Sequence, residues 1–132
     1  MNTKSLMVAS AIFLMISGLL LTFIPEEISQ YLNAGTNQTS ILFLQILGSL
    51  YLGFGMLNWM TSNLIGGIYS RPIVIGNLAH FLVASFALIK IVVKNSEKEF
   101  SFVLISTILY LLFTICFGYV FMKNPNKVMN TN

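Results

Sequence analysis

Residues 5–24 read SLMVASAIFLMISGLLLTFI, an apolar run without a charged side chain. At a rise of about 1.5 Å per residue, a helix of this length covers the roughly 30 Å hydrocarbon thickness of a bilayer. Four such runs occur, each 20 to 22 residues long and with at most one basic residue. They are residues 5–24, 41–60, 73–93 and 101–122. We therefore predict four transmembrane helices.

The composition of the whole chain agrees with this prediction. Of its 132 residues, 56% are hydrophobic and 8% are charged, whereas about 25% of the residues of soluble domains are charged. A soluble core cannot bury so large an apolar share, so lipid must replace water around most of the surface. The sequence predicts an all-α integral membrane protein, a four-helix bundle of antiparallel up-down topology in a single domain, residues 1–132.

The connector after the first run predicts a short helix over about residues 25–34. It begins with Pro25, carries two acidic residues in its first turn and is followed by Gly35, which are start and stop signals of a helix. Apolar residues such as Ile28 and Tyr31 share one face, so we expect this helix to lie along the membrane interface. A connector with an aromatic anchor and a lid over a substrate are both consistent with this pattern.

Basic residues decide the expected orientation, because short cytoplasmic loops are enriched in Lys and Arg. With four spans, the amino terminus, the middle loop and the polar tail at 123–132 share one side, and they carry Lys4, Arg71, Lys123 and Lys127. The opposite side carries Lys90, Lys94 and Lys98. This bias of four to three predicts that both termini are cytoplasmic. The Asn-rich, Lys-over-Arg composition suggests a bacterial source, hence the cytoplasmic (inner) membrane.

Several classes of function are excluded or disfavoured. The net charge of +3 is spread over the edges of the apolar runs, so nucleic acid is not an expected partner. Cys116 is the only cysteine, which excludes a disulfide within the chain, a CxxC redox pair and cysteine-ligated zinc or iron-sulfur centres. No Asp or Glu lies within a predicted span, so the carboxylate of small multidrug exporters is missing. We predict no cofactor and no metal site.

Polar side chains within the spans are the candidate functional residues, because each is costly to place in hydrocarbon. If the bundle binds a ligand, we expect five of them to line a pocket between the second and third spans for a small neutral or lipid-like molecule. These are Gln45, Asn58, Asn77, His80 and Tyr110. For His80, the only histidine, the favoured interpretation is a neutral side chain in a helix-packing face that hydrogen-bonds to Asn77, Asn58 or a carbonyl. The alternatives are an imidazole that contacts a ligand or relays a proton, and haem or metal binding.

Small residues mark the expected helix-packing faces of the second and third spans, because they let two helices approach closely. In the third span, Gly76 and Ala84 share one helical face with His80. In the second span, Ser49 and Gly53 form a step of the small-xxx-small type. The predicted packing residues are Gly48, Ser49, Gly53, Gly76 and Ala84.

Several short stretches carry a resemblance to a known group of proteins. They are Leu44–Gly48 (LQILG), Gly53–Trp59 (GFGMLNW), Gly76–Asn77, His80–Phe81 and the end of the first span, Phe23–Pro25. Over roughly residues 5–95 the chain resembles small bacterial membrane proteins of the DoxX-like four-helix group. The resemblance implies a four-helix bundle in a bacterial inner membrane, and it implies no catalytic residues.

The missing acid pair, nucleophile–base pair and metal set favour an accessory or scaffold subunit, either as a homo-oligomer or within a larger membrane complex. A ligand-binding or transport bundle that uses the predicted pocket is the alternative. A membrane enzyme is the third possibility, and His80 as its base would need Tyr110 or a bound cofactor as a partner.

Overall fold

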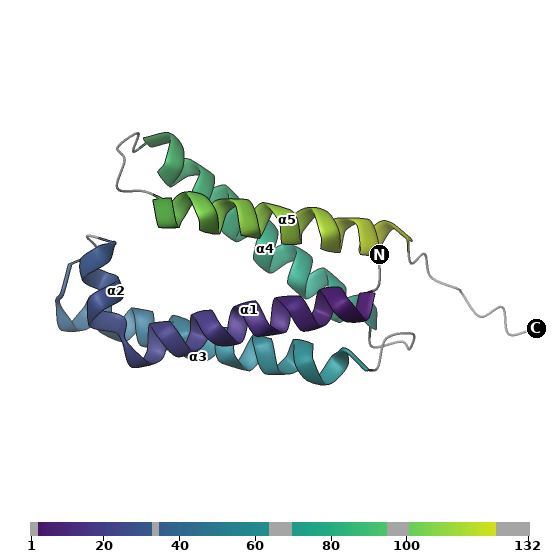
Figure 1. Ribbon diagram of the computed structural model, residues 1–132, viewed down its shortest axis with the longest axis horizontal. Coiled ribbons are helices and arrows are strands. Elements are labelled where there is room, and N and C mark those ends of the chain that lie inside the picture. Colours follow the sequence, from purple (N-terminus) through teal and green to yellow (C-terminus); the bar gives the residue numbers. More distant parts are fainter. Residues whose placement is uncertain (1–2, 33–34, 64–69, 95–100, 124–132) are drawn as a thin grey trace, which may run out of the picture. The chain divides into compact units, whose positions relative to one another are not determined.

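The computed structural model describes residues 3–32, 35–63, 70–94 and 101–123, and the regular structure in these ranges is helical. Its helices, shown in Figure 1, are α1 (Thr3–Phe23), α2 (Pro25–Tyr31), α3 (Gln38–Thr61), α4 (Ser70–Lys94) and α5 (Ser101–Lys123). Of these, α1, α3, α4 and α5 are long and apolar enough to cross a membrane. The predictions of an all-α chain and of four span-length apolar helices are confirmed.

The helix ends lie within three residues of the predicted span ends. The largest differences, three residues each, are at the starts of α3 and α4. Helix α3 begins at Gln38 because Asn37 caps it: the Ser40 N–H donates to Asn37 Oδ1 at 2.7 Å. An apolar run alone does not reveal such a polar first turn. Helix α2 begins with Pro25, as predicted, and ends at Tyr31. Three predicted features lie outside the described residues. They are the end of the short helix at 33–34, Lys98, and the tail after Lys123.

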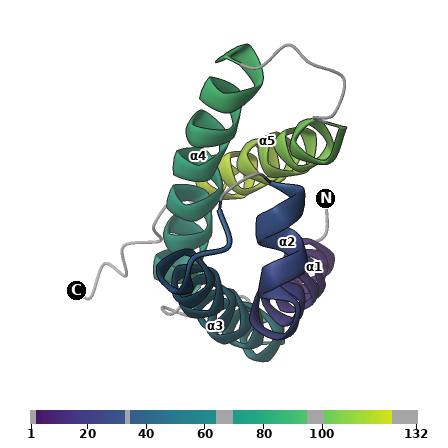
Figure 2. The ribbon, with the colours of Figure 1, turned by 90° about the vertical axis from the view of Figure 1, so that its left-hand side faces the viewer.

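The chain forms two compact units, an amino-terminal unit of Met1–Ile65 and a carboxy-terminal unit of Gly66–Asn132. In the amino-terminal unit, α1 and α3 run antiparallel and lie side by side (Figures 1 and 2). Glycine brings their backbones together: a Cβ added to Gly48 would lie 2.9 Å from the Gly18 carbonyl oxygen. Further along, one added to Gly55 would lie 3.0 Å from the Ala11 carbonyl oxygen.

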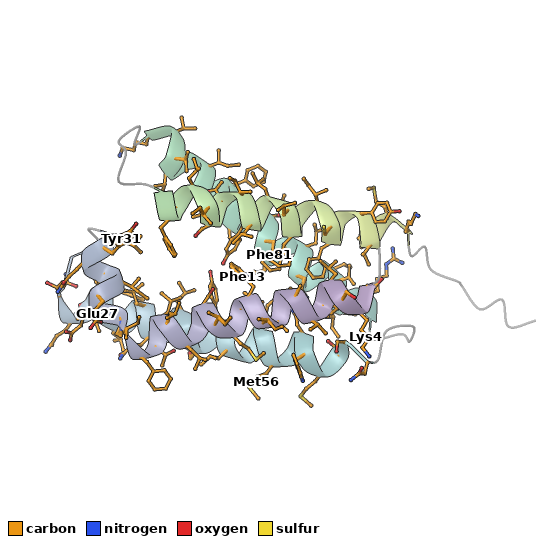
Figure 3. All side chains as sticks on the ribbon, in the orientation of Figure 1. Lys4, Phe13, Glu27, Tyr31, Met56 and Phe81 are labelled. Carbon is orange, nitrogen blue, oxygen red and sulfur yellow. The ribbon has the colours of Figure 1, made fainter. Side chains whose placement is uncertain are left out.

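Helix α2 contacts both α1 and α3, and Tyr31 and Glu27 mark it in Figure 3. Its buried Ser29 donates a hydrogen bond from Oγ to the Gly35 carbonyl oxygen at 2.5 Å. Gly35 has a φ of 81°, in the left-handed region that favours glycine. The bond therefore ties α2 to the chain that leads into α3.

In the carboxy-terminal unit, α4 and α5 pack against each other. Phe81 of α4 stacks on two rings of α5, with centroids 4.7 Å from Phe113 and 5.7 Å from Phe117. On the same side of α4, Ser85 Oγ lies 3.2 Å from Thr114 Oγ1. Arg71, near the start of α4, contacts Phe121, near the end of α5. The start of α4 thus lies beside the end of α5, so the two helices run antiparallel.

Candidate functional site

Two candidate residues of the carboxy-terminal unit, His80 and Tyr110, meet in an aromatic cluster, which we call the His80 cluster. It consists of His80 and Phe81 from α4 and Tyr110, Phe113 and Phe117 from α5. The His80 and Tyr110 ring centroids are 5.9 Å apart at an interplanar angle of 43°, and Phe81 and Tyr110 make an edge contact at 5.3 Å. His80 is half-buried and Tyr110 is 5% exposed. Two predicted ligand-binding residues are thus neighbours.

Asn77 lies one turn before Phe81 on α4 and is fully buried. Its Nδ2 donates a hydrogen bond to the carbonyl oxygen of Ile73 at 2.9 Å. This bond satisfies one amide hydrogen within the helix that carries Asn77, a local solution that polar side chains in apolar surroundings often adopt. Asn77 therefore has a structural bond on its own helix.

Ser85 is a buried polar residue of this unit that sequence reasoning missed. Its hydroxyl lies 2.7 Å from the Phe81 carbonyl oxygen as well as 3.2 Å from Thr114 Oγ1. Thr114 in turn donates to the Tyr110 carbonyl oxygen at 2.8 Å. The available signal was the spacing of Phe81 and Ser85, which places both on one helical face. Gly76 and Ala84, on the predicted face, are half-buried.

Asn58 is the central polar residue of the amino-terminal unit. Its Nδ2 donates to Ser10 Oγ of α1 at 3.1 Å, and that hydroxyl donates to the Met7 carbonyl oxygen at 2.9 Å. Asn58 and Ser10 are both fully buried. Ser10 was not among the predicted residues, because a lone serine in an apolar run carries no signal until its partner is known.

The small residues of α3 lie on two different faces. Gly48, together with Gly55, packs against α1. In contrast, Gln45 and Ser49 are exposed, and a Cβ added to Gly53 would meet no described atom within 4 Å. Ser49 donates to the Ile46 carbonyl oxygen of its own helix at 2.8 Å. We call Gln45, Ser49 and Gly53 the open face of α3.

The predicted pocket residues therefore divide between the units, with Gln45 and Asn58 in one and Asn77, His80 and Tyr110 in the other. Within each unit, the structure joins His80 to Tyr110 and joins Asn58 to Ser10. Convergence of all five on one pocket stays a prediction. Among the described residues, no group of three or more His, Cys, Asp or Glu side chains is placed to hold a metal ion.

Comparison with known proteins finds no relative. No family model matches the chain, and searches of curated proteins and of solved structures return no match. The similarity to the DoxX-like group therefore stays a prediction that rests on the short stretches quoted above.

Proposed function

We propose that this chain is a multi-pass protein of a bacterial cytoplasmic membrane, with both termini in the cytoplasm, and that it acts as an accessory or scaffold subunit. Four apolar helices of span length support the membrane location. Their surfaces carry many large exposed hydrophobic side chains, such as Phe43, Phe86 and Ile115, which lipid or another protein must cover. The subunit role rests on the open face of α3.

The open face is unsuited to lipid. Gln45 lies seven residues beyond the first residue of α3, or about 10 Å along the helix axis, so its amide falls within the hydrocarbon region. An amide in hydrocarbon without a hydrogen-bond partner is costly. Gly53, in turn, has open space where a side chain would be, which allows the backbone of another helix to come close. The open face therefore favours a transmembrane helix from outside the amino-terminal unit as its occupant, and we propose that this helix belongs to another subunit.

The buried polar side chains, which lie outside the open face, support a structural function. Asn58 bonds to Ser10, Asn77 to the Ile73 carbonyl and Thr107 to the Val103 carbonyl, so each of these contacts stays within one unit. Their described bonds join helices or satisfy the helix that carries them. These bonds stabilise the fold of each unit, which is the role expected of buried polar groups in a scaffold without catalytic activity.

The test is purification of the tagged chain from its native membrane in a mild detergent, followed by measurement of the particle mass. We expect a complex of defined stoichiometry larger than the 14.7 kDa chain. Gly53→Leu should dissociate it, since the new side chain would fill the open face. The matched control is Leu50→Trp, which adds bulk at another exposed position of α3 and should leave the mass unchanged. If the unmodified chain has the particle mass of a monomer, the proposal is refuted.

A second copy is the competing occupant of the open face. Cys116 is the only cysteine, so Cys116→Ser combined with Ser49→Cys gives a chain with one thiol on this face. Mild oxidation in the membrane should not link two such chains. A disulfide-linked dimer would instead make the protein a homo-oligomer.

A ligand-binding bundle is the second candidate, and the contact between His80 and Tyr110 favours it. A half-buried imidazole beside a phenol can hold a small neutral or lipid-like ligand by hydrogen bonds. The test is a thermal-shift screen of such compounds in detergent. Stabilisation that is lost in both His80→Ala and Tyr110→Phe but kept in Trp59→Phe would support this function, and the same stabilisation in all three variants would reject it.

A further inference from the structure

One end of the α4–α5 pair carries two cations, each held over an aromatic ring. Arg71 Cζ lies 5.3 Å from the centroid of the Phe121 ring, and Lys123 Nζ lies 4.8 Å from the centroid of the Tyr119 ring. Arg71 is in the first turn of α4 and Lys123 is the last residue of α5. Because the helices are antiparallel, both cations are at the same end, which we call the basic end.

The sequence around the basic end contains no acidic residue. Between residues 62 and 96, and again from 100 to 132, there is no Asp or Glu, while Lys127 adds a further positive charge to the tail. The other end of α4 differs, because Lys90, Lys94 and Lys98 are followed or flanked by Glu97 and Glu99. Negative charge for the basic end must therefore come from outside this part of the chain.

The geometry favours a charged surface over a single bound anion. Tyr119 and Phe121 are two residues apart, so their side chains leave α5 in directions about 200° apart. Arg71 lies over the Phe121 ring and Lys123 over the Tyr119 ring, so the two cations are on different sides of the last turn of α5. A single phosphate cannot bridge cations on opposite sides of a helix, but several headgroups in one lipid leaflet can surround it. Long basic side chains suit the headgroup region, because their apolar stems can lie against hydrocarbon while their charges reach the phosphates.

We propose that the basic end binds the phosphate groups of anionic phospholipids, with Arg71 and Lys123 each contacting a different headgroup. The aromatic rings hold the two cations in place, since a cation over a ring is attracted to its face. The inference rests on the membrane location in the proposed function, but it does not depend on the subunit role.

The test measures the affinity of the purified chain, in a neutral detergent, for phosphatidylglycerol relative to phosphatidylcholine, by counting bound lipids with native mass spectrometry. The unmodified chain should prefer phosphatidylglycerol. Each of Arg71→Gln and Lys123→Gln should lower this preference about five-fold, and the double variant about 25-fold. The charge-preserving variants Arg71→Lys and Lys123→Arg should keep it, which separates loss of charge from loss of folding.

The matched control is Lys90→Gln with Lys94→Gln, which removes two exposed lysines from the opposite end of α4. Its preference should stay within about two-fold of the unmodified chain, because the charges of the basic end are intact. An equal loss in control and test variants, or no loss in the test variants, would overturn the proposal. Displacement of the lipid by inorganic phosphate would do so too, because the site would then bind a soluble anion.

Membrane location itself is tested separately by flotation of the chain with phosphatidylcholine vesicles in alkaline carbonate. Failure to float would contradict the proposed function as well as this inference. Flotation without any preference for phosphatidylglycerol would contradict the inference alone.

Discussion

Gly48 and Gly53 both lie on α3, but their surroundings differ. A Cβ added to Gly48 would lie 2.5 Å from Thr22 Oγ1 and 2.9 Å from both the Gly18 carbonyl oxygen and the Thr22 nitrogen. Two of these three atoms belong to the backbone of α1, which cannot move aside as a side chain can. One added to Gly53 would meet no described atom within 4 Å. A single methyl group therefore distinguishes the two faces of α3.

We predict that Gly48→Ala lowers the free energy of unfolding by about 1–3 kcal/mol, because α1 and α3 must separate to admit the methyl group. Gly53→Ala should leave it unchanged or slightly raise it, because alanine is the better helix former. The measurement is the thermal melting of both variants in the same detergent. Equal melting temperatures would mean that α1 does not pack on Gly48.

His80→Ala should reduce thermal stability in detergent more than Trp59→Phe does. The first change removes ring contacts with Phe81 and Tyr110, whereas Trp59 is half exposed at the end of α3 and keeps an aromatic ring. Melting curves of the two variants, recorded against the unmodified chain, test this prediction. An unchanged melting temperature for His80→Ala would contradict a packing role for the imidazole.

At the scale of elements, apolar length and turn signals were sufficient to predict the helices, including the one that starts at Pro25. They were insufficient for the contacts between helices. Ser10 and Ser85 became evident only once Asn58 and Thr114 had been placed next to them. The face on which a serine hydroxyl lies is readable from the sequence, but the helix opposite it is not.

The connection from α2 to α3 should depend on Ser29. Ser29→Ala removes the hydroxyl that bonds to the Gly35 carbonyl, and we expect it to destabilise this connection by about 1 kcal/mol. Limited proteolysis near Gly35 should become faster, with Ser49→Ala as the control, because its hydroxyl is exposed and bonds only within its own helix turn in the described contacts. Equal proteolysis of both variants would show that the bond does not hold α2.

At the scale of the whole molecule, the orientation can be tested with a reporter enzyme that is active only in the cytoplasm. Fusions at the amino and carboxyl ends should be active, because the proposed up-down topology puts both ends on the same side as Arg71 and Lys123. Insertion at the exposed Thr36, in the connector without Lys or Arg, should be inactive. If the reporter is active at Thr36 and inactive at both ends, the predicted orientation is wrong.

The bond between Asn58 and Ser10 has a consequence for synthesis in the proposed membrane setting. The Ser10 hydroxyl donates to the Met7 carbonyl of its own helix, so α1 can enter lipid alone at little cost. The Asn58 amide instead donates to a helix made earlier. Because α1 is synthesised before α3, the Ser10 acceptor is already in the bilayer when α3 leaves the translocation channel. Reversing the order of the two segments by circular permutation would bring the Asn58 amide into the bilayer before its Ser10 acceptor.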